Sequence, residues 1–324
     1  MARTRLYHEG TLVAEDYPVA DISDHLGDER AVVWLDMCEP TQADFDAISE
    51  ELGLHHLAVE DALDFNQRSK VDRYRSHLFI SAYGVALDAE AGRLDLSEIG
   101  VFVTRQALVT VRRDQQLDID AVVARWDENA DLAKYGVAFL LWALLDYLVD
   151  GHMAAVQDLD SALDEIEDAL FDSGRPAVKA VQRRSFQLRK SLVVMRRVVT
   201  PMREVVNALM RPNLHVVDEP MLPYYQDVYD HVLRSTEWTE SLRDLVTTIL
   251  ETNLTIQGNR MNMIMKKVTS WAAIIAVPTA ITGFYGQNVP YPGFGKFWGF
   301  VVSTAVTAAL SIGLYVTFRR NDWL

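Results

Sequence analysis

The chain has 324 residues, a net charge of −15 at pH 7 and a mean hydropathy of zero. This acidic balance argues against nucleic acid as a partner, because nucleic-acid binding needs a basic face, and it suits a partner that is a cation. The single cysteine, Cys38, excludes an internal disulfide.

Residues 1–115 mix short β-rich runs with turn clusters, which predicts an α/β domain built around a mostly central sheet. The predicted strands cover residues 31–35, 77–83, 98–103 and 107–111. Between the first two strands, Thr41 and Asp44 predict the start of a helix, and Gly53 predicts its end. The adjacent pair His55–His56 is interpreted as a helix-start feature rather than as a pair of metal ligands.

Strand signals stop after residue 115, and residues 116–220 are predicted to be helical. Residues 158–172 contain seven acids and no base, whereas residues 179–203 contain eight bases and no acid. One interpretation is an antiparallel pair of helices that neutralise each other. The other is an acidic comb that concentrates cations.

A long helix is predicted next, because Pro223 suits the first turn of a helix and no proline follows until Pro278. At 1.5 Å per residue, residues 224–277 would extend roughly 80 Å. Residues 221–267 are expected to form a soluble stalk that continues without a break into a membrane span. Such a stalk would link the soluble domain mechanically to the membrane.

Residues 268–318 are predicted to form a transmembrane hairpin of two helices with an outer loop at 285–296, and they contain the only two segments expected to span a bilayer. A basic collar flanks this hairpin and consists of Lys266, Lys267, Arg319 and Arg320. By the positive-inside rule, the collar places both termini, including the tail 319–324, in the cytoplasm. The chain is therefore expected to be a multi-pass protein of the cell (inner or plasma) membrane, with anionic lipid as a partner of the collar.

One face of the first span carries mostly small or weakly polar residues at spacings of three and four. This pore stripe consists of Asn262, Met265, Thr269, Ala272, Ala276, Thr279 and Gly283. Small residues on one helix face allow close packing of helices in a membrane. Alternatively, several copies of the face surround a channel, with hydroxyl and amide groups contacting water. The channel interpretation requires a homo-oligomer, because two helices cannot enclose a pore.

Gly286, Gln287 and Asn288 follow the stripe at its outer end. Asn288 offers a neutral amide oxygen, which suits the bound waters of hydrated magnesium because this ion gives up its water reluctantly. Gly286 is expected to permit a tight turn, since glycine adopts backbone angles that other residues avoid.

Several motifs occur in a fixed order along the chain. They are Val59–Asp61, Gln67–Val71, Pro201–Val205, Tyr225–His231, Pro278–Asn288 and Arg319–Leu324. In this order they resemble the CorA family of divalent cation transporters over almost the whole chain. The resemblance implies a funnel-shaped homopentamer in which a cytoplasmic α/β domain leads to a stalk helix, a pore-lining first span and an outer second span. It also implies that Gly286-Gln287-Asn288, in place of the family's Gly-Met-Asn, is the selectivity filter.

The resemblance further implies gating by magnesium that is held between neighbouring subunits. The matching carboxylates are Asp61 and Asp227, with Glu60 and Asp146 as further candidates. Carboxylates that face one another repel without a cation and are bridged when one binds. Without the resemblance, each would be interpreted as a solvated charge or a helix cap. Met265 and Val268 would form an apolar constriction that gates by dewetting, with Asn262 one turn below.

The expected function is influx of a divalent cation, with Mg²⁺ as the transported and the regulatory ion and Co²⁺ or Ni²⁺ as further cargo. Neither span contains Cys or His, which favours hard, hydrated ions. Gln287 leaves two alternatives open: a transporter of Zn²⁺ or another transition metal with the same fold, and a membrane-anchored cation sensor or scaffold that does not conduct. An enzyme is not expected, because the sequence shows no Ser-His-Asp arrangement, Gly-rich phosphate loop or HExxH pattern.

Overall fold

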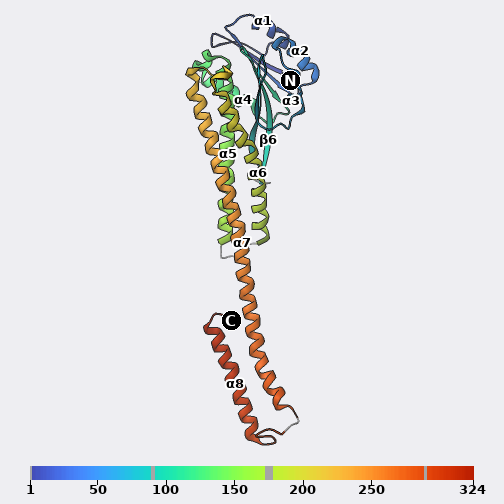
Figure 1. Ribbon diagram of the computed structural model, residues 1–324, viewed down its shortest axis with the longest axis vertical. Helices are drawn as coiled ribbons and strands as arrows, with labels where there is room; N and C mark the ends of the chain where they lie inside the picture. Colours follow the sequence, from blue (N-terminus) through green and yellow to red (C-terminus); the bar gives the residue numbers. More distant parts are fainter. Residues whose placement is uncertain (1, 89–91, 172–177, 288–289) are drawn as a thin grey trace. The chain divides into compact units, whose positions relative to one another are not determined.

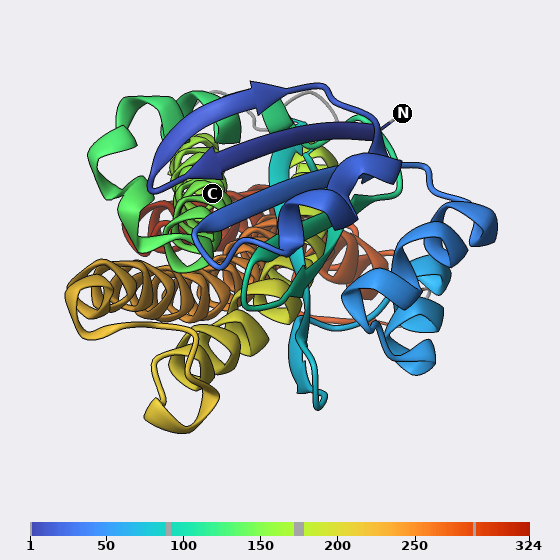
Figure 2. The same ribbon diagram turned by 90° about the horizontal axis from the view of Figure 1, so that it is seen from above.

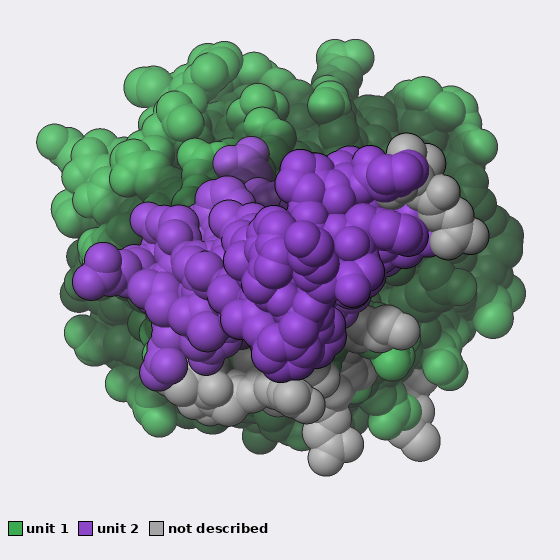
Figure 3. Space-filling model, turned by 90° about the horizontal axis from the view of Figure 1, so that it is seen from below, with its two compact units in different colours: residues 1–249 green, residues 250–324 purple. Residues whose placement is uncertain are grey.

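The computed structural model describes residues 2–88, 92–171, 178–287 and 290–324. Two compact units divide the chain, Met1–Ile249 and Leu250–Leu324, and Figure 3 colours them green and purple. Within the described residues, every strand lies in the N-terminal unit, and the C-terminal unit is helical.

The N-terminal unit is built on one sheet that has seven strands among the described residues. They are β1 (Ala2–His8), β2 (Thr11–Glu15), β3 (Ala31–Cys38), β4 (Lys70–Arg73), β5 (Leu78–Asp88), β6 (Arg93–Val103) and β7 (Ala107–Arg112). Their order across the sheet is β2-β1-β3-β7-β6-β5-β4. Strands β3 and β7 pair in parallel, and the other neighbours pair antiparallel. Side chains alternate between the two faces, so that Trp34 joins one core and Val33 the other.

All four predicted strands are confirmed, as β3, β5, β6 and β7. The sequence patterns do not predict β1, β2 and β4. Strand β4 has the sequence Lys-Val-Asp-Arg and lies at an edge of the sheet, where few apolar side chains are needed. Strand β1 buries Arg5, whose guanidinium group bonds to Glu15 and Asp127, and a buried arginine does not follow the usual apolar alternation of a strand.

Three short helices cover one face of the sheet, namely α1 (Ile22–Leu26), α2 (Gln42–Leu52) and α3 (His56–Asp64). The predicted start of α2 is confirmed, because the Thr41 backbone N–H donates to the Asp44 carboxylate at 2.7 Å. Gly53 ends the helix with a φ of 62°, which glycine adopts easily. His55 precedes α3 and accepts a hydrogen bond from the Leu57 N–H through Nδ1 at 3.2 Å. The interpretation of His55 as a helix-start feature is therefore confirmed.

The short helix α4 (Ile119–Glu128) and three long helices pack on the other face, the long ones being α5 (Val137–Phe171), α6 (Val178–Leu209) and the first part of α7 (Leu222–Tyr285). Figures 1 and 2 show α5, α6 and this part of α7 gathered on one side of the sheet. The core between them contains Trp34, Trp126, Phe139 and Tyr225, none of which is more than 1% exposed. The helical prediction for residues 116–220 is confirmed in the described part of that range.

Among the described residues, three helices rather than two are long and apolar enough to cross a membrane. They are α5, α7 and α8 (Phe297–Arg320), so the prediction of only two such segments is wrong. The most apolar stretch of α5 is 67% buried inside the protein, against 6% for the corresponding stretches of α7 and α8. The apolar side chains of α5 therefore belong to the core of the N-terminal unit. Burial, which composition does not reveal, separates this helix from the two candidate spans.

The acidic and basic segments lie on α5 and α6, which pack against each other as predicted. Among the side chains described there, one ion pair joins the two segments, between Arg184 and Glu165 at 2.7 Å. Both side chains are more than half exposed, so the pair stabilises the contact little. Both segments also carry buried apolar side chains, among them Leu159, Leu163, Ile166, Leu170, Leu188, Leu192 and Met195. Apolar burial therefore holds the two helices together.

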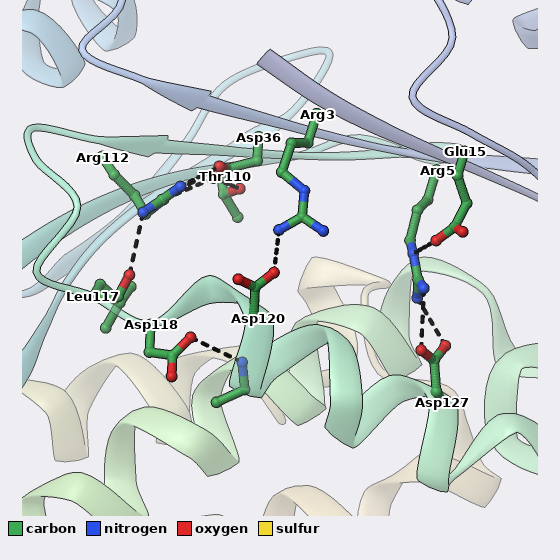
Figure 4. A network of polar contacts seen from close by, with 11 residues as sticks. Arg3, Arg5, Glu15, Asp36, Thr110, Arg112, Leu117, Asp118, Asp120 and Asp127 are labelled. Atoms are coloured by element: carbon green, nitrogen blue, oxygen red, sulfur yellow. Dashed lines mark hydrogen bonds and ion pairs between the residues drawn. The ribbon is translucent and has the colours of Figure 1, made fainter. Parts of the chain in front are cut away.

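A buried ion pair joins the two parallel strands on the face that α4 covers (Figure 4). Arg112 on β7 donates through Nη2 to Asp36 on β3 at 2.6 Å, and the two side chains are 7% and 1% exposed. Asp36 also accepts from the Thr110 hydroxyl at 2.7 Å. Arg112 in turn donates to the Leu117 carbonyl at 3.2 Å. The network satisfies both charges, and neither would be tolerated alone at this depth.

Helix α7 is continuous over 64 residues and contributes to both units. The predicted continuity of the stalk with the first span is confirmed, because the helix runs through Pro278 to Tyr285. The Thr282 hydroxyl donates to the Pro278 carbonyl at 2.8 Å.

Replacing Asp36 by Ala should destabilise the N-terminal unit, because the Arg112 guanidinium would remain buried without a counter-charge. We expect a loss of roughly 3–5 kcal/mol, which lowers the midpoint of thermal unfolding by about 10 °C in a unit of this size. Thermal unfolding of the full chain, followed by circular dichroism, measures this shift. The matched control Glu165→Ala breaks the exposed pair and should cost below about 1 kcal/mol. Equal midpoints for the two variants would contradict the central role of the buried pair.

Candidate functional site

Asp146, Asp227 and His231 form the Asp-Asp-His cluster, in which the possible ligand atoms all lie within 4.8 Å of one another. Asp146 comes from α5, and the other two come from α7. Asp227 and His231 are four residues apart, a spacing that places two side chains on the same face of a helix. The structure thus brings together two of the four carboxylates predicted as metal ligands.

The packing of α7 on α5 positions the cluster. The Tyr225 hydroxyl donates to the Ala138 carbonyl at 2.9 Å, and the rings of Tyr224 and Trp142 meet edge to face at 5.2 Å. These contacts fix α7 two to three residues before Asp227. The cluster therefore lies on a supported part of the helix rather than on a loop, and its ligand atoms are held close without a cation.

Arg125 on α4 controls the electrostatics of the cluster. Its guanidinium group bonds to Asp146, and it also donates to Asp150 at 2.8 Å. Burial raises the pKa of Asp146, while the positive charge of Arg125 opposes this rise. A cation at the cluster would thus compete with Arg125 for the Asp146 carboxylate.

His231 is the ligand that the sequence analysis missed. The available signal is its spacing from Asp227, which lies on the same predicted helix. Two carboxylates and an imidazole suit Co²⁺, Ni²⁺ or Zn²⁺, because imidazole is a good ligand for these ions. Mg²⁺ prefers oxygen ligands only. The donor set therefore admits Mg²⁺ through its carboxylates but favours a transition metal.

The two remaining predicted carboxylates lie elsewhere. Asp61 on α3 pairs with the Lys70 ammonium at 2.6 Å, and Lys70 also bonds to Asp72 at 2.9 Å. Although burial lowers the pKa of Lys70, these two carboxylates raise it overall. Glu60 is exposed. Helices α3 and α7 cover opposite faces of the sheet, so one chain does not bring Asp61 to Asp227.

The predicted pore stripe lies on the face of α7 that is turned away from α8. Ser270, Ile281 and Tyr285 are partly or fully buried, and the last two line a cavity of about 560 Å³ together with Phe300 and Ser303 of α8. At 3.6 residues per turn, the stripe falls on the opposite side of the helix. All of its members and Val268 are exposed: Asn262, Met265, Val268, Thr269, Ala272, Ala276, Thr279 and Gly283. Asn262, Met265 and Thr269 line a cavity of about 530 Å³ together with Trp323, which follows α8.

The predicted filter follows the end of α7. The Gly286 N–H donates to the Thr282 carbonyl at 2.8 Å, and the Gln287 N–H donates to the Phe284 carbonyl at 3.3 Å. The expectation that Gly286 uses a glycine-only conformation is wrong, since its φ is not positive. A Cβ atom there would instead meet the Thr282 carbonyl oxygen at 3.0 Å, so close packing accounts for the glycine. Asn288 lies outside the described residues.

The predicted basic collar gathers at one end of the C-terminal unit. The Lys266 ammonium lies 5.8 Å from the centroid of the Trp323 ring, which follows α8. This contact brings Arg319 and Arg320, at the end of α8, to the level of Lys266 and Lys267. All four side chains are exposed, as a lipid-binding collar requires.

A family model described as "CorA-like Mg2+ transporter protein" matches residues 29–320. The chain is 29% identical over 300 residues to the cobalt/magnesium transport protein CorA of Thermotoga maritima, covering 92% of this chain and 85% of that one. It is 23% identical over 258 residues to the zinc transport protein ZntB of Yersinia enterocolitica, covering 79% and 77%.

The fold is also that of a solved structure. The complete structure of the CorA magnesium transporter from Methanocaldococcus jannaschii matches with a TM-score of 0.77 and 21% identity, over 100% of this chain and 99% of that one. Among the curated relatives, both magnesium or cobalt and zinc occur as the named cargo.

Replacing His231 by Gln should weaken Co²⁺ binding to the cluster at least about tenfold, because loss of even an outer-shell partner has effects of this size. Mg²⁺ binding should change less, since Gln retains an oxygen ligand. Titration of the full chain with Co²⁺, followed by visible absorption, measures the difference. His56→Gln, at an exposed position on α3, serves as the control. Equal Co²⁺ affinity in the His231 variant and the parent chain would rule out His231 as a ligand.

Proposed function

The chain belongs to the CorA-like Mg²⁺ transporter family, and we propose that it forms a homopentameric channel through which Mg²⁺ enters the cell. Family membership makes it a membrane transporter of divalent metal ions and not an enzyme. Beyond family membership, we propose the transported ion, the direction of transport and the number of subunits. We also propose that anionic lipid binds the basic collar and that both termini lie in the cytoplasm.

The exposed pore stripe carries this proposal. On one helix, a face with Thr and Asn groups and small side chains is turned away from the partner helix α8 and remains exposed. In a membrane, exposed polar groups need either protein partners or water. Several copies of α7 around one axis would provide both, with α8 outside. Met265 and Val268, 56% and 59% exposed in the single chain, would then form the apolar constriction.

Mg²⁺ is proposed as the cargo because, apart from the Met265 thioether, the polar groups of the pore stripe, Gly286 and Gln287 are amide, hydroxyl and backbone groups, whose oxygen atoms suit a hydrated hard ion. The relative named as a cobalt/magnesium transport protein supports this choice. Zn²⁺ is the second candidate, supported by the relative named as a zinc transport protein. The imidazole of His231 favours transition metals at the cluster, but that site lies outside the proposed pore.

Reconstitution of the full chain into liposomes with ion-sensitive dyes tests the cargo. We expect Mg²⁺ influx well above that of empty vesicles, and faster than Zn²⁺ influx at equal gradients, because the stripe contains no Cys or His. Asn288→Ala should abolish the flux if this residue forms the filter, whereas Asn321→Ala, beyond the end of α8, should leave it unchanged. Faster Zn²⁺ than Mg²⁺ influx would reverse the assignment. No flux above that of empty vesicles would favour the non-conducting sensor or scaffold.

We further propose that cytoplasmic Mg²⁺ closes the channel by bridging carboxylates of neighbouring copies. Asp227 and Asp61 support this role because they lie on opposite layers of the N-terminal unit, where one chain alone does not join them. Glu60 and Asp146 are the further candidates, and Asp146 already faces Asp227 within one chain. A bound cation removes the repulsion between such groups.

Asp227→Asn should therefore require a higher Mg²⁺ concentration inside the vesicle for closure, since the bridging charge is lost. We expect a shift of roughly tenfold, the usual scale for one lost charge-assisted contact of about 1.4 kcal/mol. The control is Asp230→Asn, which removes an exposed charge from the same helix outside the cluster. An equal response of both variants to internal Mg²⁺ would show that the bulk charge of α7, and not a specific bridge, controls closure.

A further inference from the structure

A cavity of about 1070 Å³ in the N-terminal unit is unrelated to the cluster and the stripe. It lies between the segment after α3, strand β6, the segment after β7 and helix α6, with Arg243 of α7 at one side. Its floor contains the apolar side chains of Leu94, Leu96 and Val198. Its volume is that of a site for a small organic molecule.

The side chains that line this cavity include six arginines and only three carboxylates, and we call it the arginine pocket. The arginines are Arg68, Arg93, Arg113, Arg196, Arg197 and Arg243. The chain as a whole has a net charge of −15, so the excess of positive charge in this cavity is opposite in sign to the charge of the whole chain. A guanidinium group stays protonated at any physiological pH, and the positive excess is therefore permanent.

The carboxylates of the pocket already have partners. Glu98 accepts hydrogen bonds from the backbone N–H groups of Asn66 and Gln67. Asp95 pairs with Arg93 at 3.0 Å, and Asp114 accepts from a backbone N–H at 3.0 Å. Of these three acids, only Asp95 forms an ion pair with an arginine of the pocket.

Among the described residues, Arg68 and Arg197 have no ion pair, and both side chains are exposed. Arg113 lies over the Phe65 ring at 5.9 Å, which leaves its hydrogen-bond donors free. Arg196 and Arg243 share the single carboxylate of Glu240. Guanidinium groups from α6, from α7 and from the segments after α3 and β7 thus line one cavity, and several of their N–H groups have no hydrogen-bond partner among the described residues.

We propose that the arginine pocket binds a small anion that carries two or more phosphate groups. A single carboxylate would neutralise one guanidinium group. A chain of phosphates presents several charged oxygen atoms, which can bond to several guanidinium groups at once. The apolar floor at Leu94 and Leu96 would accept the organic part of a nucleotide. The same charge pattern would accept an inorganic polyphosphate without it.

Calorimetric titration of the full chain in detergent tests the proposal, with ATP and inorganic tripolyphosphate as separate probes and AMP as the single-phosphate reference. EDTA must be present, because ATP chelates the divalent cations that other sites of this chain bind. We expect at least one polyphosphate to bind with a dissociation constant below about 1 mM and at least about tenfold more tightly than AMP. Tighter binding of ATP than of tripolyphosphate would identify a nucleotide, and equal binding would identify the phosphate chain alone.

Arg68→Gln and Arg197→Gln should each weaken binding of the polyphosphate roughly tenfold, as expected for loss of one charge-assisted contact. Neither residue has an ion pair among the described residues, so both variants should keep the parent's midpoint of thermal unfolding. The matched control is Arg189→Gln, which changes an exposed arginine of α6 outside the pocket. Absence of binding by both polyphosphates, or an equal loss in the control, would overturn the proposal.

Discussion

The burial of α5 is the constraint on which the N-terminal unit depends. This helix is apolar enough to cross a membrane, and it lies in the protein core because the sheet, α4, α6 and the first part of α7 pack around it. The Tyr225 hydroxyl bond to the Ala138 carbonyl at 2.9 Å fixes the register of α7 on α5. That register decides which side chains of α7 meet Asp146, so the Asp-Asp-His cluster is a consequence of core packing.

Helix α7 carries both the cluster and the pore stripe, because it continues unbroken over 64 residues. Asp227 and His231 lie near its start, and the stripe from Asn262 to Gly283 lies on its apolar part. A continuous helix transmits a rotation or a shift along its hydrogen-bonded backbone, provided that its supported end can take two positions on α5. A cation that binds more tightly in one of these two positions of α7 would shift the equilibrium toward that position. Regulation and conduction would then be linked by one element.

Strong periodic patterns made much of this fold predictable. The four apolar strands, the cap of α2 at Thr41 and the long stretch of α7 between Pro223 and Pro278 each follow from local sequence. The missed features depend on tertiary partners. Strand β1 buries Arg5 because Asp127 of α4 meets it, α5 is a core helix because other elements cover it, and His231 becomes a candidate ligand only when α5 brings Asp146 to it. The pore stripe is exposed in the single chain, and its role in a pore stays a prediction.

Arg125 determines the state of the cluster when no cation is bound. Burial raises the pKa of Asp146, and the guanidinium of Arg125 opposes this by bonding to the carboxylate. A divalent cation would supply the same compensation. Arg125 bonds to Oδ2 of Asp146, so a cation that binds this oxygen atom would displace the guanidinium group, which does not lose its proton. Cation binding would then replace the contact of Asp146 with Arg125 of α4 by a contact, through the cation, with Asp227 and His231 of α7. The affected helix α7 is the one that carries the pore stripe.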